Sequence, residues 1–161
     1  MPTPIQAIAG VANACQVLPT LVAGGQPQAG HIQALREAGV SVVLDIRHPM
    51  EPRPVDESRL VRSLGMEYFN IPVTHGALDD ASLNRILEIL RGSEDKTVFF
   101  HCASGNRVGG ALIPYLMIDK GMHEEDAIAI ARRSGLRSMD VLQWGLDYVR
   151  RHQDSPGSGS Q

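Results

Sequence analysis

Val98-Phe99-Phe100-His101-Cys102-Ala103-Ser104-Gly105-Asn106-Arg107-Val108-Gly109-Gly110 is the stretch of this sequence that decides the fold. An apolar run of strand length ends at His101-Cys102, a short loop of small and polar residues follows, and an apolar helical pattern begins near Arg107. Ligands of open α/β sheets bind outside the carboxyl ends of the strands. The stretch therefore predicts a buried strand that directs the thiol of Cys102 into a crevice, next to the start of a helix.

The loop between Cys102 and Arg107 has the composition of an anion-binding site. It contributes four successive backbone N–H groups, those of Ala103, Ser104, Gly105 and Asn106. Such groups can converge on one anion, and the N-terminus of the following helix adds further donors. The planar guanidinium of Arg107 suits two oxygen atoms of the same anion. The loop therefore predicts a Cys102 thiolate beside a bound tetrahedral anion, with the Ser104 hydroxyl helping to stabilise the sulfur.

His101-Cys102, Gly105, Arg107 and Gly109 resemble the phosphate-binding loop of the cysteine-dependent protein tyrosine and dual-specificity phosphatases. The wider sequence is most similar to the bacterial dual-specificity-phosphatase-like family, which includes the phosphatase domain of beta-lactamase hydrolase-like proteins. The matching segments follow the family's order: 23–27, 42–47, 68–73 and 101–109. The resemblance implies a hydrolase in which Cys102 forms a phosphocysteine, Arg107 and the loop amides bind the phosphoryl group, and no metal or other cofactor is needed.

The loop departs from the family pattern in its length. Four residues separate Cys102 from Arg107, whereas the phosphatases have five. A four-residue spacing also resembles the active loop of rhodanese-type sulfurtransferases, whose cysteine carries a persulfide. Two alternatives to a phosphatase therefore stay open: a sulfurtransferase that uses a Cys102 persulfide, and a phosphate-binding regulatory module with little catalysis.

The resemblance implies a general acid on the loop that follows the strand at 67–71. An acid there would protonate the leaving oxygen and later activate water. Asp79 and Asp80 are the candidates for this catalytic role, and His75 on the same loop is a further one, because histidine is a common general acid and base. Both carboxylates also directly precede a helical pattern, where such side chains cap helix starts. Catalysis and capping are therefore competing interpretations of Asp79 and Asp80.

Two further side chains are expected to support the site. The resemblance implies that His101 hydrogen-bonds the loop, either as a structural residue or as one that tunes the thiolate. Arg47 follows the strand at 40–46, in a segment with three prolines among eight residues. If that strand is parallel to the strand of Cys102, then Arg47, with His48 and Arg53, opens on the same crevice and reads a second anionic group of the substrate. The alternative is a proline-stiffened, solvent-exposed loop.

Strands alternate with helices along the chain, which predicts an α/β fold with a small, mostly parallel, four- to five-stranded sheet flanked by helices. The apolar periodicity predicts strands at 17–23, 40–46, 67–71 and 97–101. It predicts helices at 31–39, 57–64, 81–91, 108–118, 124–134 and 139–152. Pro19 interrupts the first strand, and Pro114 is expected to kink the helix that contains it.

The length of 161 residues predicts one domain, spanning 1–152, and the Ser- and Gly-rich residues 153–161 are typical of a flexible tail. A net charge of −3 argues against a nucleic-acid partner. No apolar run approaches the ~20 residues of a membrane helix, and no charged segment precedes an apolar core at the start of the chain. We therefore expect a cytoplasmic protein that does not bind membranes.

The remaining cysteine and the histidines give no sign of a disulfide or metal site. Cys15 and Cys102 are too few for a disulfide framework, although Cys15 as a redox partner of Cys102 stays an alternative to a buried apolar role. The six histidines do not have the spacing of zinc ligands. The expected partner is a phosphorylated protein or a small-molecule phosphoester, and the sequence does not indicate the oligomeric state.

Overall fold

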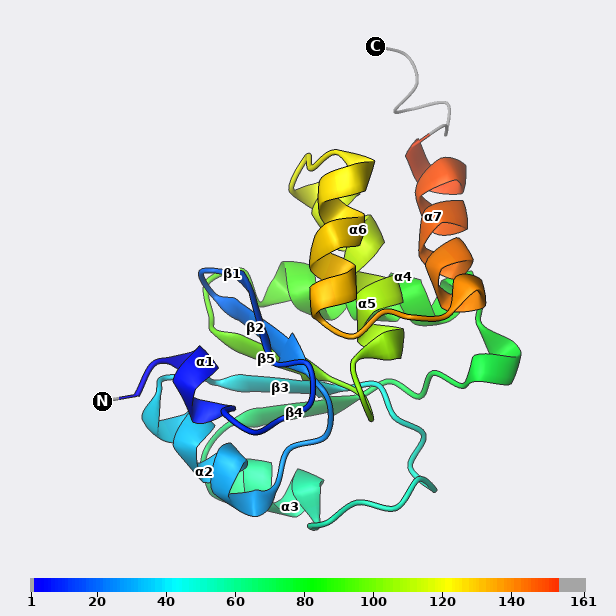
Figure 1. Ribbon diagram of the computed structural model, residues 1–161. Coiled ribbons are helices and arrows are strands. Elements are labelled where there is room, and N and C mark those ends of the chain that lie inside the picture. Colours follow the sequence, from blue (N-terminus) through cyan, green and yellow to red (C-terminus); the bar gives the residue numbers. More distant parts are fainter. Residues whose placement is uncertain (1, 154–161) are drawn as a thin grey trace.

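The computed structural model describes residues 2–153, which form a five-stranded sheet between two layers of helices (Figure 1). The strands are β1 (Cys15–Leu18), β2 (Leu21–Gly24), β3 (Val42–Asp45), β4 (Glu67–Asn70) and β5 (Val98–His101). Their spatial order is β1-β2-β5-β3-β4, and every neighbouring pair is parallel except β1 and β2. The predicted α/β fold with a mostly parallel sheet is therefore confirmed.

Helices cover both faces of this sheet (Figure 1). One face carries α1 (Pro4–Ala7), α2 (Ala29–Glu37) and α3 (Glu57–Ser63). The other carries α4 (Asp80–Gly92), α5 (Asn106–Pro114), α6 (Glu124–Arg133) and α7 (Met139–Gln153). Successive strand residues point to opposite faces, so Phe99 packs in the cluster with α1–α3 and Phe100 in the cluster with α4–α7. This two-sided burial explains why the central strands are continuous apolar runs.

The parallel register brings three distant segments together at one edge of the sheet. His101, at the end of the central strand β5, is aligned with Gly24 of β2 on one side and with Asp45 of β3 on the other. The loops that leave these strands therefore start next to one another. They carry Cys102, Gln26 and Arg47, and these residues build the candidate site.

The structure differs from the sequence prediction at two places in the first part of the chain. The single strand expected at 17–23 is wrong: the chain turns at Pro19-Thr20 and forms two antiparallel strands, β1 and β2. Proline cannot continue a ladder in the middle of a sheet because it lacks an N–H group. A short helix, α1, was not predicted, and its N-terminus is stabilised by a capping box between Thr3 and Gln6.

Pro114 distorts its helix as expected. The regular helix α5 ends at Pro114, and a wider π-helical turn, η2 (Tyr115–Asp119), continues it. A proline removes one backbone hydrogen bond and crowds the preceding turn, and the wider turn accommodates both effects. The start of α5, which faces the site, stays regular.

The expectation of one domain followed by a flexible tail stays a prediction. The helix α7 extends through Gln153, one residue into the segment predicted as a tail, and 154–161 lie outside the described residues. Over residues 2–153, no helix combines the length and the apolar character needed to cross a membrane.

Candidate active site

Cys102 lies directly after β5, at the base of the loop that leads into α5. Its side chain is almost fully buried, with 1% of the residue exposed, and the Gly105 N–H donates to the Sγ atom at 3.1 Å. An N–H group directed at the sulfur stabilises negative charge there. The predicted proximity of Cys102 to a loop amide is therefore present in the structure.

Gly105 gives the loop its shape. Its φ angle of 96° lies in the left-handed region, and it forms the N-cap of α5. A Cβ atom at this position would lie 1.8 Å from the Ser134 carbonyl oxygen, so no other residue fits. The first N–H groups of α5, from Asn106 and Arg107, have no partner within the helix. They lie at the positive end of the helix dipole, which favours an anion next to Cys102.

The end of β2 holds the loop from the other side. The Gln26 N–H donates to the Ala103 carbonyl at 3.0 Å, and the Cys102 N–H donates to the Gly24 carbonyl at 3.3 Å. A Cβ atom on Gly25 would lie 2.5 Å from the Ala103 oxygen, so the close contact requires glycine. The Gly-Gln turn is thus part of the loop's support, although it lies far away in the sequence.

Asn106 connects the loop to the segment between α6 and α7. Its Oδ1 atom accepts from the N–H groups of Arg137 and Ser138, at 2.9 and 3.3 Å, and its Nδ2 atom donates to the Ser138 hydroxyl at 3.0 Å. The side chain is therefore committed to holding that segment. Only the backbone N–H of Asn106 is available to an anion.

Arg107 is held by a carboxylate that was not predicted from the sequence. Its Nη1 and Nη2 atoms donate to the two oxygens of Glu51, at 2.8 and 3.0 Å, and Nη1 also donates to the Val73 carbonyl at 2.9 Å. Burial alone would lower the pKa of Arg107, but the hydrogen bonds with Glu51 and the proximity of Cys102 raise it. Arg107 is thus a fixed cation beside the thiol.

Glu51 is shared between Arg107 and a second arginine. One of its oxygens accepts from Arg47 Nε at 2.9 Å, and the other accepts from the His48 N–H at 2.8 Å. The Arg107 hydrogen bond is the main cause that lowers the pKa of Glu51 from 4.5 to about 2, and burial acts in the opposite direction. The sequence signal for Glu51 was weak, because only the cations of this proline-rich loop suggested anion binding.

The lowered pKa of Glu51 predicts how stability depends on pH. The ionised carboxylate stabilises the folded state fully above its ordinary pKa of 4.5, and this contribution is lost as the pH falls towards the folded value of about 2. We expect urea denaturation to show a decline in the free energy of unfolding across that window, and a smaller decline in Glu51→Gln. Glu88→Gln, which changes an exposed carboxylate of α4, is the matched control. An unchanged slope in Glu51→Gln would contradict the assignment.

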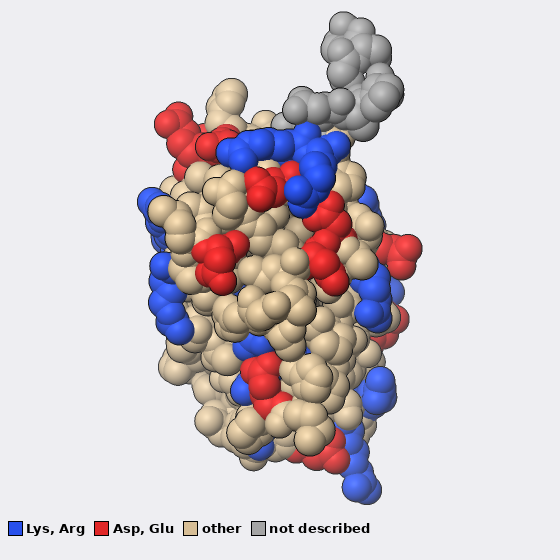
Figure 2. All heavy atoms as spheres, turned by 90° about the vertical axis from the view of Figure 1, so that its right-hand side faces the viewer, with Lys and Arg blue, Asp and Glu red and all other residues tan. Residues whose placement is uncertain are grey.

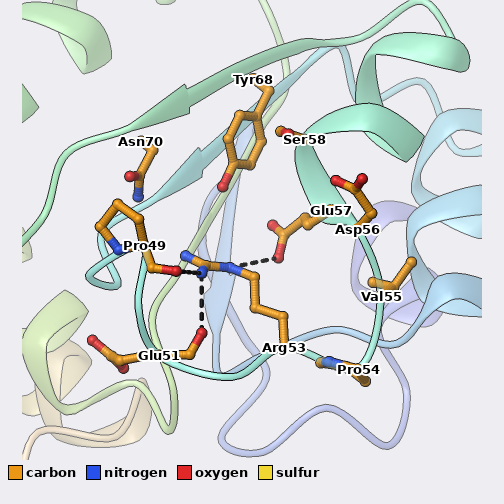
Figure 3. Close-up of a pocket in the computed structure, with 10 residues that line it drawn as sticks. All are labelled: Pro49, Glu51, Arg53, Pro54, Val55, Asp56, Glu57, Ser58, Tyr68 and Asn70. Atoms are coloured by element: carbon orange, nitrogen blue, oxygen red, sulfur yellow. Dashed lines mark hydrogen bonds and ion pairs between the residues drawn. The ribbon is translucent and has the colours of Figure 1, made fainter.

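Arg47 and Arg53 lie at the site but are engaged by groups of the chain itself. Arg47 donates from Nε to Glu51 and from Nη1 to the Gln26 side chain at 2.8 Å. Arg53 forms an ion pair with Asp45 at 2.6 Å and extends between Glu57 and the backbone of the 49–51 segment (Figure 3). Both guanidinium groups are therefore paired with carboxylates of the chain. The binding of a second substrate anion by Arg47 and Arg53 stays a prediction, and these ion pairs do not favour it.

His101 is fully buried behind Cys102. Its Nε2 atom contacts Glu57 Oε2 at 2.5 Å, its Nδ1 atom contacts the Cys102 carbonyl at 3.1 Å, and its ring stacks on Phe99. Burial would lower the pKa of His101, but the Glu57 carboxylate raises it. Both ring nitrogens face acceptors, and only the imidazolium form donates from both. The expected hydrogen bond between His101 and the loop is present.

The carboxylates near His101 belong to a closed hydrogen-bond network. Oxygen or nitrogen atoms of Asp45, Glu57 and His101 lie within 4.8 Å of one another, a spacing that also suits a metal ion. However, Asp45 accepts from Arg53, from the Tyr68 hydroxyl and from a backbone N–H, and Glu57 accepts from Gln26. Because protein donors already use these oxygens, the geometry fits an internal network better than a cation site.

The three candidates for the general acid lie in different environments. Asp79 caps α4, accepting from the Ser82 N–H at 2.9 Å, which lowers the pKa of Asp79. Asp80 pairs with Arg151 through two hydrogen bonds of 2.6 and 2.9 Å. The predicted capping role is thus confirmed for Asp79. By contrast, His75 Nε2 lies 3.4 Å from the side-chain nitrogen of Asn106, next to the loop that follows Cys102.

A cavity of about 630 Å³ opens beside the carboxylate of Glu51. Polar side chains from the loop after β3, from α3 and from β4 line it, among them Arg53, Tyr68 and Asn70 (Figure 3).

Acidic and basic side chains alternate on the face that contains α7, without a large area of one charge (Figure 2). This face therefore carries no large patch of one charge.

Comparisons with known proteins agree with this geometry. Residues 13–143 match the family model described as DSP-PTPase phosphatase fused to NAD+ kinase, and no curated protein matches the sequence. A DUF442 protein from Shewanella putrefaciens CN-32 has a similar structure, with a TM-score of 0.77 and 20% identity over 91% of this chain and 97% of that chain. A cysteine-to-serine variant of P. aeruginosa TpbA in complex with phosphotyrosine has a TM-score of 0.68 and 20% identity, over 93% of this chain and 86% of that chain. Tk-PTP in its active form has a TM-score of 0.71 and 18% identity, over 86% of this chain and 97% of that chain.

Proposed function

The chain belongs to the family described as DSP-PTPase phosphatase fused to NAD+ kinase, and from this premise we propose that it hydrolyses a phosphomonoester through a phosphocysteine on Cys102. The family predicted from the loop sequence is thereby confirmed, and the enzyme class is that of a dual-specificity or tyrosine-type hydrolase. Phosphotyrosine, carried by a protein or a small molecule, is the first candidate substrate. The cytoplasmic location stays a prediction.

The single observation that carries this proposal is the arrangement of Cys102, Gly105 and Arg107. An N–H group is directed at the sulfur at 3.1 Å, and a fixed guanidinium lies beside it. Glu51 pairs with the two terminal nitrogens of Arg107, and within residues 2–153 no carboxylate pairs with its Nε donor. These groups suit a phosphoryl group in which charge is spread over three equatorial oxygens. The short loop of four residues thus still presents both a nucleophile and anion donors.

The reaction has two steps. In the first, Cys102 Sγ attacks phosphorus, the S–P bond forms and the P–O ester bond breaks, while an acid transfers a proton to the leaving oxygen. In the second, water attacks phosphorus, the S–P bond breaks and inorganic phosphate leaves, with the acid residue now accepting the proton of water. Arg107 and the loop amides stabilise the equatorial oxygens in both steps. The Ser104 hydroxyl stabilises the departing thiolate in the second step.

We assign the acid role to His75, because among the three candidates it is the one that contacts the phosphate loop. Asp79 and Asp80 remain the competing candidates from the sequence. Both are engaged elsewhere, by the α4 cap and by Arg151. With this assignment, the dependence of turnover on the basicity of the leaving group tests the proposed function directly.

The experiment compares the hydrolysis of phenyl phosphate and of para-nitrophenyl phosphate. We expect His75→Gln to lower kcat on phenyl phosphate by about 10²-fold, because the phenolate that leaves this substrate is basic and needs a proton. The effect should be smaller on para-nitrophenyl phosphate, whose leaving group is less basic. Asp79→Asn is the matched control, because asparagine also caps helices.

Two results would contradict these assignments. A loss confined to Asp79→Asn or Asp80→Asn would return the acid role to an aspartate. No hydrolysis of any phosphoester, together with transfer of sulfur from thiosulfate to cyanide by the wild type, would replace the phosphatase with the sulfurtransferase.

A further inference from the structure

Gln26 lies between the two halves of the site and contacts both. Its Nε2 atom donates to Glu57 Oε1 at 2.7 Å, and its Oε1 atom accepts from Arg47 Nη1 at 2.8 Å. A primary amide offers a donor at one end and an acceptor at the other. It can therefore join a carboxylate to a guanidinium, which a carboxylate or an ammonium group in its place could not do.

On the donor side, the hydrogen bonds continue to the residue before the nucleophile. The second oxygen of Glu57 holds His101 Nε2, and His101 Nδ1 faces the Cys102 carbonyl. Glu57 is 1% exposed and His101 is fully buried. A rearrangement of Glu57 would leave a buried imidazole without its partner, and unmade hydrogen bonds in such surroundings are costly.

On the acceptor side, the hydrogen bonds continue to the phosphate-binding arginine. Arg47 Nε donates to Glu51, and Glu51 holds both terminal nitrogens of Arg107. Arg47 and Arg107 are 8% and 4% exposed. The position of Arg107 therefore depends on Glu51, and the position of Glu51 depends in part on Arg47.

We propose that Gln26 is a positioning residue of the phosphatase site, and that the two ends of its side chain serve different steps. The donor end fixes the Glu57–His101 pair behind Cys102 and so governs the reactivity of the sulfur. The acceptor end fixes the Arg47–Glu51–Arg107 series and so governs the binding of phosphate. This inference rests on the proposed function, but it concerns two properties that are measurable without turnover.

The test uses two substitutions that separate the ends of the side chain. Gln26→Glu keeps an oxygen acceptor for Arg47 but places a carboxylate against Glu57, so only the donor side is broken. Gln26→Met has a similar length and removes both polar ends. Gln33→Glu and Gln33→Met on α2, at an exposed position, are the matched controls.

The readouts are the rate at which iodoacetamide alkylates Cys102 as a function of pH, followed by peptide mass spectrometry, and the Kd of inorganic phosphate. In Gln26→Glu we expect the alkylation profile to move to higher pH, with about tenfold slower reaction near neutral pH, and the phosphate Kd to stay within about threefold of wild type. In Gln26→Met we expect the phosphate Kd to rise by about tenfold as well. Both Gln33 variants should match wild type.

Three results would overturn the inference. The first is a Gln26→Glu variant in which the alkylation rate and the phosphate Kd are both unchanged. The second is a Gln26→Glu variant in which alkylation and phosphate binding are weakened equally, and the third is the same weakening in the Gln33 controls. Circular dichroism and thermal denaturation check that the variants are folded, and Gln26→Glu alone decides the question if Gln26→Met does not fold. A protein that shows the expected separation but hydrolyses no phosphoester would support the positioning role and refute the phosphatase.

Discussion

Replacing Cys102 by serine is expected to lower kcat on para-nitrophenyl phosphate by a factor on the order of 10⁵. A serine hydroxyl is a far weaker nucleophile than a thiolate, and the groups described next to the Cys102 sulfur, the Gly105 N–H and the Arg107 guanidinium, are donors that cannot act as a base. The Gly105 N–H and Arg107 stay in place, so the affinity for inorganic phosphate should remain close to that of wild type. The measurement is turnover together with phosphate binding.

Cys15→Ser is the control for this substitution. Cys15 lies in β1, is buried and is likewise a free thiol. Its replacement should leave kcat unchanged if Cys102 alone is the nucleophile. Hydrolysis retained in Cys102→Ser would refute the nucleophilic mechanism, whereas a joint loss in both variants would point to a redox role of the Cys15 thiol.

Replacing Arg107 by lysine is expected to lower kcat/KM by about 10³-fold. Lysine keeps the positive charge but loses the planar fork, so it cannot pair with the two oxygens of Glu51 and also present a donor to the phosphoryl group. The Glu51 carboxylate would then be held only by Arg47 and the His48 N–H, so more of its negative charge would face the substrate and repel it. Both effects act on the transition state, so kcat should fall as well as the affinity for phosphate.

Arg91→Lys provides the matched comparison for Arg107→Lys. Arg91 also forms a two-pronged ion pair, with Asp119, but at an exposed position away from the site. We expect this variant to have wild-type kinetics. A loss of less than about tenfold in Arg107→Lys would show that the planar fork contributes little, and that the loop amides alone bind the phosphoryl group.

The sequence predicted those parts of the fold that depend on local patterns. The run from Val98 to Phe100 is apolar at every position because β5 is covered on both faces, and this is visible without any structure. The distortion of the helix at Pro114 could likewise be predicted from the proline itself. Pro19 was recognised as a break, but its consequence was not, because whether a chain turns back or continues depends on the strands that flank it.

The carboxylates of the site were harder to predict. Glu51 and Glu57 reach Arg107 and His101 only because β3 and β5 are aligned in register and because α3 starts where it does. No local spacing encodes those contacts. Gln26 was recognised as part of a family motif, yet its function as a bridge depends on two residues from other segments.

Asp79 shows a different limit of the sequence. A carboxylate before a helix is equally suited to capping and to acid catalysis, and both interpretations follow from the same residue pattern. The hydrogen bond to the Ser82 N–H confirms the cap. His75 was a weaker candidate in the sequence, because exposed loop histidines are common. Only its contact with Asn106 in the structure distinguishes it from such a histidine.

The most direct test of the account is to trap the covalent intermediate. The wild-type protein would be mixed with para-nitrophenyl phosphate, quenched in acid within the first turnovers, and analysed by intact mass and by peptide mapping. We expect one added phosphoryl group, located on Cys102 and absent from Cys102→Ser. Steady hydrolysis without any phosphorylated Cys102, or with the phosphoryl group on another residue, would contradict the phosphocysteine mechanism.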